Sequence, residues 1–300
     1  MIFFFFHKTN NKDSSSLFWL SKETSIIVNN WFMMYFLSVV LIGTIYPIFL
    51  DVLSSQKISV GPPFYHKLII PFLIPFLLIM AIGPKLSWIK SNLEEKNHLI
   101  LFLIISILIS AIVVVNFNSN FLLNTILVSS ALYLFFVTLR DSFSKKYKNF
   151  SQNISHIGFS LLILSILLNN ISSSEIITNL KVGETFEINK TKIIFKSINQ
   201  KKEQNYKSIK GTFIIQNING VKNKMYPELR IYNQPNIVTS EADIKTTLMS
   251  DKFIVINLVK NQEYFNVRYQ VKPFMLWIWL SVVLICFGGS MSFFKKKYEK

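Results

Sequence analysis

The sequence predicts an α-helical membrane protein with about six transmembrane helices and one β-rich extramembrane domain inserted before the last helix. Three observations predict this fold class. The composition is 51% hydrophobic and only 16% charged, which is too apolar for one soluble domain. Much of the apolar content lies in runs that match the roughly 30 Å hydrocarbon core of a bilayer. One long segment before the last run instead alternates apolar and polar residues.

The apolar runs mark the predicted membrane spans. In chain order they are Trp31–Leu50, Leu68–Gly83, Leu99–Val115, Phe121–Leu139, Ile154–Ile171 and Pro273–Phe294. The second span is the shortest, and it carries Pro71 and Pro75 on one face. Membrane helices tolerate proline when neighbouring helices satisfy the freed carbonyls, so we expect a kinked helix that faces other helices. Just before it, Pro62 and Pro63 predict a stiff extended loop.

Loop charge predicts the orientation of the spans, because Lys and Arg near helix ends stay on the side from which the chain is inserted. The short loops of one side hold only Lys57 and Lys67. The other side holds Lys8, Lys12, Lys22, Lys85, Lys90, Lys96, Arg140, Lys145, Lys146, Lys148, Lys295, Lys296, Lys297 and Lys300. Both termini are therefore predicted on the inner side, which is the cytoplasm for a bacterial inner membrane or the matrix for a mitochondrial inner membrane.

The same reasoning divides the chain into five parts. We expect an inner-side N-terminal segment at 1–30, a five-helix transmembrane bundle at 31–171, an outer domain at 172–272, the last helix at 273–294 and a basic inner-side tail at 295–300. The outer domain would face a periplasm or an intermembrane space. Its length of about 100 residues is enough to bury a small core of its own.

Alternation of apolar and polar residues predicts β structure in the outer domain. The candidate strands are Lys192–Ile198, Thr212–Ile218, Lys252–Leu258 and Tyr264–Val271. Asn219-Gly220 lies between two alternating runs and is a strong signal for a two-residue hairpin turn. We expect an antiparallel sandwich or barrel.

Several functional classes are disfavoured. The net charge of +16 is spread over loops and the polar domain instead of one face, which argues against nucleic-acid binding. Cys286 is the only cysteine, so this chain has no disulfide framework, CxxC pair or thiolate metal site. The Met1–Phe6 run lacks the flanks of a signal peptide. Charged residues near mid-membrane, which a transporter would need, are not evident.

The charged residues of the outer domain have two interpretations. Arg230 with Glu228, and Glu241 with Asp243, could form a charged active site. Hydrolysis also needs a nucleophile, and the sequence offers none nearby. We therefore favour structural polar groups of the β domain. Trp277 and Trp279 lie where an aromatic belt is expected at the outer end of the last span.

Ordered motifs over nearly the whole chain resemble the C-terminal half of the CcmF family of cytochrome c haem lyases. The motifs are Trp19-Leu20-Ser21-Lys22-Glu23, Asn29-Asn30, Gly43-Thr44-Ile45-Tyr46-Pro47, Ser59-Val60-Gly61-Pro62-Pro63-Phe64-Tyr65, Gly83-Pro84, Ser155-His156-Ile157-Gly158, Tyr226-Pro227-Glu228-Leu229-Arg230-Ile231-Tyr232, Thr239-Ser240-Glu241-Ala242-Asp243-Ile244, Tyr269-Gln270-Val271-Lys272-Pro273-Phe274, Trp277-Ile278-Trp279 and Gly288-Gly289. Each motif alone is weakly specific, but their order and spacing together are specific.

The resemblance implies a component of the haem lyase of cytochrome c maturation. Such a component helps to transfer haem from a CcmE-type haem chaperone to the CxxCH motifs of apocytochrome c, alongside a CcmH-type thiol-handling subunit. The family holds its haem substrate on a tryptophan-rich WWD segment, which none of the five tryptophans here forms. The gene is then split, with a complementary N-terminal CcmF half, or the chain is a fragment. Whether the chain alone is an enzyme stays open, and a non-catalytic membrane scaffold is the alternative.

The resemblance assigns His156 as an axial ligand of a membrane haem b, which would reduce the incoming haem. From the residues alone, a hydrogen bond from this imidazole to a neighbouring helix is at least as good an explanation, since a histidine inside a span needs some partner. The family's second ligand belongs to the missing half. Pairing with His98 within this chain is a less favoured alternative, and His66 is interpreted as a surface residue.

Overall fold

The computed structural model describes residues 21–54, 58–88, 96–117, 120–144, 149–188, 191–216, 222–259 and 263–295. Two compact units make up the fold. The first unit contains Met1–Ala111 and Thr125–Asn153, and the second contains Ile112–Asn124 and Ile154–Lys300. The predicted hairpin turn at Asn219-Gly220 and the motif residues Trp19 and Leu20 lie outside the described residues.

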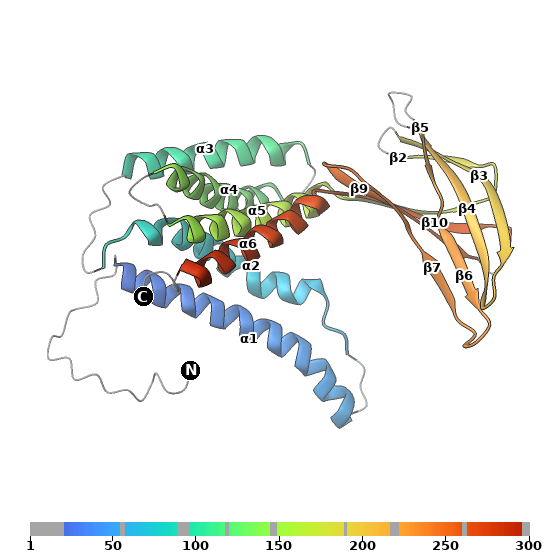
Figure 1. The fold of residues 1–300 in the computed structure, drawn as a ribbon, viewed down its shortest axis with the longest axis horizontal. Helices are drawn as coiled ribbons and strands as arrows, with labels where there is room; N and C mark the ends of the chain where they lie inside the picture. The colour runs from blue at the N-terminus through green and yellow to red at the C-terminus, as the bar shows by residue number, and fades with distance from the viewer. Residues whose placement is uncertain are drawn as a thin grey trace. The chain divides into compact units, whose positions relative to one another are not determined.

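Within the described residues, six helices are long and apolar enough to cross a membrane, as predicted (Figure 1). They are α1 (Lys22–Ser54), α2 (Pro62–Ile82), α3 (Lys96–Val115), α4 (Phe121–Phe143), α5 (Phe150–Ser172) and α6 (Met275–Lys295). The extended loop predicted at Pro62 and Pro63 is wrong, because both residues belong to the first turn of α2. Proline is well tolerated there, since the first helical N–H groups have no partner within the helix.

Aromatic contacts pack α1 against α2 in the first unit. Phe36 of α1 meets Phe76 of α2 edge to face, with 5.5 Å between the ring centroids. One turn away, the Tyr35 ring lies 4.3 Å from that of Phe72, and its hydroxyl donates a 2.9 Å hydrogen bond to the carbonyl of Leu68. The tyrosine thus packs its apolar ring while its polar tip is satisfied within the protein.

The second unit carries the β domain, a sandwich of two antiparallel sheets. Its strands are β1 (Ser174–Leu180), β2 (Thr185–Ile188), β3 (Thr191–Lys202), β4 (Tyr206–Gln216), β5 (Lys222–Met225), β6 (Glu228–Tyr232), β7 (Val238–Glu241), β8 (Asp243–Thr246), β9 (Ser250–Leu258) and β10 (Phe265–Pro273). One sheet has the order β1-β10-β9-β8. The other has the order β2-β3-β4-β6-β7, and β5 also pairs with β4.

Alternating side chains of both sheets form a single core. Phe195 of β3 and Phe213 of β4 are fully buried and stack with ring centroids 4.3 Å apart. Ile254 of β9 and Val267 of β10, also fully buried, belong to the same cluster. Each strand therefore presents one face to the core, as the period of two in the sequence indicates.

The four predicted strands are confirmed as parts of β3, β4, β9 and β10. The antiparallel pairing of the flanking strands, in which Gln216 lies opposite Lys222, shows a hairpin, whereas the predicted two-residue turn at Asn219-Gly220 stays a prediction. Strands β1, β2 and β5 to β8 were not individually predicted. All of these except β1 have only four or five residues, too few to establish an alternating pattern.

The aromatic stack predicts how the domain responds to core substitution. Phe213→Ala should destabilise the β domain by about 3–5 kcal/mol, because it removes a buried ring and leaves a cavity. The urea dependence of proteolysis, measured on the full chain in detergent, reports this loss. Ile244→Ala is the control, because Ile244 is 52% exposed. An equal effect of both substitutions would contradict this account of the core.

Candidate functional site

His156 lies in the second turn of α5. Its side chain is half-buried, and it makes no hydrogen bond or ion pair with any other residue in the described part of the chain. The sequence left open a hydrogen bond to a neighbouring helix, and the described residues supply no such partner. Within the described part of the chain, the ring nitrogens of His156 are therefore left available to a further group.

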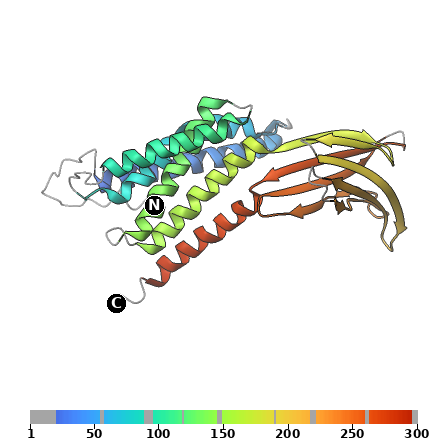
Figure 2. The same ribbon diagram turned by 90° about the horizontal axis from the view of Figure 1, so that it is seen from above.

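A close helix contact fixes how this part of α5 is turned. A Cβ atom on Gly158 would lie 2.9 Å from Cγ1 and 3.0 Å from the backbone nitrogen of Ile285 in α6. Only glycine permits this approach, as at many helix contacts in membranes. Figure 2 shows α5 and α6 side by side. Because each helical residue turns about 100°, His156 lies on the side of α5 away from this contact.

If a haem were bound here, His156 is the described residue that could hold its iron. Haem iron takes an imidazole nitrogen at an axial position, and an imidazole without a protein partner can supply it. Within the described ranges, no group of three or more His, Cys, Asp or Glu residues could hold a metal ion by itself. His66 in α2 and His98 in α3 both have exposed side chains. The exposure of His66 agrees with its interpretation as a surface residue.

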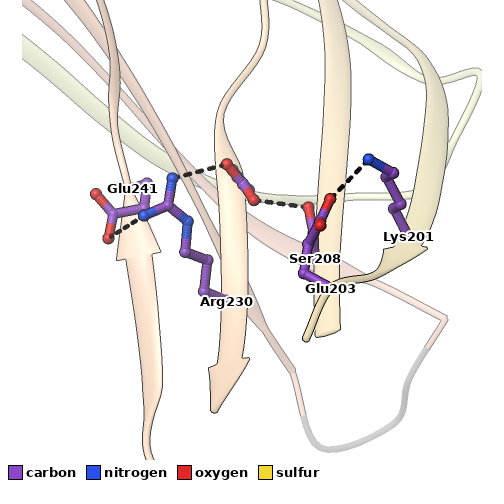
Figure 3. Close-up of polar contacts among 6 residues, drawn as sticks. Lys201, Glu203, Ser208, Arg230 and Glu241 are labelled. Carbon is purple, nitrogen blue, oxygen red and sulfur yellow. Dashed lines mark hydrogen bonds and ion pairs between the residues drawn. The ribbon is translucent and has the colours of Figure 1, made fainter. Parts of the chain in front are cut away.

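A polar network lies on the outer face of the second sheet of the β domain (Figure 3). Arg230 donates from Nη2 to Oε2 of Glu228 at 3.1 Å, and its Nη1 lies 3.7 Å from Oε1 of Glu241. The hydroxyl of Ser208 donates a 2.7 Å hydrogen bond to the other oxygen of Glu228. The guanidinium also lies over the ring of Tyr206, with 5.3 Å to the ring centroid. Five side chains from three strands thus hold one another.

Strand register explains why these residues meet. Ser208 of β4 is paired with Arg230 of β6, and Lys201 of β3 is paired with Ser208. Paired residues point to the same side of a sheet, so their side chains form a row across it. Figure 3 shows this row running from Glu241 through Arg230 and Ser208 to Lys201. The intervening residues Ile209 and Leu229 point into the core.

The network supports the structural interpretation of these charges over an active site. Asp243 does not join it, and instead accepts a hydrogen bond from the backbone N–H of Tyr226. The carboxylate of Glu228 is fully engaged by Arg230 and Ser208, which removes it from acid–base work. Beside the network lies an open hollow of about 470 Å³. It is lined by Gln200, Lys201, Lys202, Tyr206, Lys207 and Asn233.

The sequence analysis missed a buried ion pair in the first unit. Lys85, at the end of the 3₁₀ turn Gly83–Lys85 that follows α2, pairs with Asp141 in the last turn of α4. The two side chains are only 3% and 6% exposed. Lys85 was counted only as an inner-side loop charge. Asp141 is the sole acidic residue of α4. Because a lone carboxylate in an apolar helix requires a partner, this residue was the sequence signal that could have revealed the pair.

The β domain supplies the deciding comparison. Residues 171–273 match the family model described as the CcmF C-terminal beta-sandwich. The chain is similar to the C-terminal half of the CcmF proteins. CcmF of Pseudomonas fluorescens is 28% identical over 297 residues, which cover 93% of this chain and 44% of the relative. CcmF of Escherichia coli is 23% identical over 289 residues, 93% of this chain and 45% of the relative.

A third relative, NrfE of Haemophilus influenzae, is 22% identical and covers 94% of this chain and 46% of its own length. The chain thus spans less than half the length of these curated relatives. A solved structure named cytochrome c heme lyase CcmF matches 90% of this chain and 45% of that chain. Its TM-score is 0.70 at 18% sequence identity, which shows that the CcmF fold is shared. With six spans and these relatives, the chain is a multi-pass membrane protein.

The buried ion pair predicts an asymmetric mutational response. Lys85→Met should destabilise the protein by about 3–5 kcal/mol, because it leaves the Asp141 carboxylate buried without this lysine. The double variant Lys85→Met/Asp141→Leu should recover much of that loss, because no buried charge of the pair remains. Thermal unfolding in detergent micelles measures both. A double variant that is no more stable than the single one would contradict the pairing.

The outer-face network predicts a shifted titration. The hydrogen bond from Arg230 holds the pKa of Glu228 below its ordinary value of 4.5, and Ser208 and Lys210 act in the same direction. The stabilisation by Glu228 is therefore present above its unfolded pKa and is lost as the pH falls through the folded pKa. Arg230→Met should raise the folded pKa and remove most of this stabilisation.

Carbon NMR of the side-chain carboxyl groups measures this shift, and the resonance absent from Glu228→Gln identifies Glu228. Arg268→Met is the matched control, because Arg268 instead lowers the pKa of Glu175 on the other sheet. An unchanged Glu228 titration in Arg230→Met would be inconsistent with the network.

Proposed function

We propose that this chain is a component of a cytochrome c maturation haem lyase. In this role it helps to transfer haem from a haem chaperone and to attach it covalently to the CxxCH motifs of apocytochrome c. The similarity to CcmF over 93% of the chain supports this role. The observation that supports a haem-binding role for one residue concerns His156. Its side chain is half-buried, has no partner among the described residues and is turned away from the Gly158 contact.

In this proposal, His156 is one axial ligand of a haem b within the membrane. A haem held by two imidazoles is six-coordinate and supplies electron transfer in place of oxygen binding, so it would serve as the reductant for incoming haem. The role of the protein is to hold the imidazole of His156 in position. The Gly158 contact sets the rotation of α5, and the apolar helix keeps the imidazole out of bulk water.

The second axial ligand and the platform for the haem substrate are assigned to a complementary N-terminal CcmF half or subunit. The chain spans less than half of its relatives, and a haem shared between two halves needs a ligand from each. Its tryptophans also contain no WWD segment. Haem attachment is therefore proposed for the assembled pair.

The β domain is proposed as the docking surface for the other components. These are a CcmE-type haem chaperone, a CcmH-type thiol-handling subunit and apocytochrome c. The outer-face network supports this, because hydrogen-bonded side chains on a sheet present fixed polar groups at low entropic cost. Loop charge supports a position of this domain on the outer side, and of both termini on the inner side, of a bacterial or mitochondrial inner membrane.

A non-catalytic scaffold is the second candidate. The organised polar face around Arg230 favours it, because a protein that only recruits partners needs such a face and no haem. If the chain is such a scaffold, His156 has no iron to bind.

One substitution separates the two proposals. His156→Ala, in the chain purified with its N-terminal counterpart, should abolish the absorption spectrum of a bis-histidine haem, because iron loses one axial ligand. His66→Ala is the matched control, since His66 is exposed at the start of α2. Unchanged haem content in the His156→Ala complex would favour the scaffold. If His98→Ala also abolished the bis-histidine haem spectrum, this result would instead support the pairing of His98 and His156.

A further inference from the structure

The turn between β8 and β9 carries two apolar side chains at its tip. Two hydrogen bonds from Thr247 close the turn. Its backbone N–H and its hydroxyl both donate to the carbonyl of Ser250, at 3.0 and 2.7 Å. The tip residues Leu248 and Met249 are 69% and 66% exposed. Two-residue turns in water are usually built from Gly, Asn or Asp. A closed turn with Leu and Met at its tip is therefore unusual in water and favours an apolar surrounding.

Both tip carbonyls are bound to the beginning of α6. The indole N–H of Trp277 donates a 3.0 Å hydrogen bond to the carbonyl of Leu248, and the backbone N–H of Phe274 donates a 2.9 Å bond to that of Met249. Phe274 has φ of 61°, in the left-handed region, where it turns the chain from β10 into α6. The turn is thus held against the first turn of this helix.

This attachment sets the depth of the tip relative to a bilayer. The apolar part of α6, Met275–Phe293, has 19 residues, which corresponds to about 28 Å at 1.5 Å per residue and so to nearly the whole hydrocarbon core. The first turn of α6 must then lie where the hydrocarbon meets the head groups. A tryptophan at this point is typical of that boundary. Leu248 and Met249 lie at the same level, on the turn bonded to Trp277.

We propose that the β8–β9 turn inserts Leu248 and Met249 into the membrane, at the boundary between lipid head groups and acyl chains, and so anchors the β domain to the bilayer surface. Moving two such side chains from water into an apolar medium is favourable. The bilayer is the partner that the structure favours, because the turn continues the lipid-exposed surface of a membrane-spanning helix.

The surrounding charges agree with this partner. Lys245 of β8 and Lys252 of β9 lie directly opposite each other in the ladder, three residues before and three after the tip pair. Strands rise about 3.3 Å per residue, so the two lysines lie roughly 10 Å from the tip. Lipid phosphates are found at that height above the acyl chains. Two lysines side by side repel each other. Lys245 donates a hydrogen bond to Asn223, and nearby phosphate groups would further lower the repulsion.

Spin labels on the full chain in lipid nanodiscs test the proposal. The background is Cys286→Ser, which removes the only cysteine. Labels are placed through Leu248→Cys or Met249→Cys, both at exposed positions that tolerate a label. Val182→Cys is the matched water-facing control, because Val182 is 48% exposed in the turn that follows β1, at the opposite end of the sheet. Val283→Cys, 63% exposed in the middle of α6, is the lipid reference.

Collision with oxygen, which dissolves in lipid, is compared with collision with a water-soluble nickel chelate. At positions 248 and 249, the oxygen-to-nickel collision ratio should be severalfold higher than at 182 and should approach the value at 283. A ratio equal to that at 182 would overturn the proposal. So would low collision with both agents, because it would mean that protein and not lipid covers the turn.

Discussion

The arrangement of the second unit depends on one continuous pair of antiparallel segments. Helix α5 continues into β1, and β10 continues into α6, so that two helices in contact lead into two strands in register. The Gly158 contact fixes the helical end, the side-chain amide of Asn169 donates to the carbonyl of Pro273 at the junction, and the β1–β10 ladder extends from there. The rotation of His156 and the position of the sandwich are therefore set by the same pair.

The helices and the sheet hold their charged groups in two different ways. Where a charged group is buried among helices, as Asp141 is, an opposite charge meets it directly. Where charges line the sheet, as Arg230 does, register brings carboxylates into reach without a need for burial. The helical ion pair is costly to break because water cannot replace the lost partner. The sheet network is more exposed and contributes a fixed arrangement more than a large free energy.

The sequence was most informative for elements with a regular pattern over many residues, namely helices as long as the membrane is thick and long alternating strands. Six helices followed from apolar runs of membrane thickness, and most of the nine residues of β9 and of β10 followed from the alternation of apolar and polar side chains. Strands β6 to β8 depend on pairing with distant partners, which short segments do not reveal. His156 was found through its motif, whereas its orientation required the contact of Gly158 with Ile285. The Lys85–Asp141 pair escaped because a charge near a helix end resembles an ordinary loop charge until its partner is known.

The Lys85–Asp141 pair also constrains the order in which the protein can be built. Its two residues are separated by 56 positions, so the carboxylate leaves the ribosome well after the lysine. The pair cannot form until α3 and most of α4 have been synthesised. The contact between the end of α2 and α4 is therefore completed only after α4 has been made, although α1 can already pack against α2.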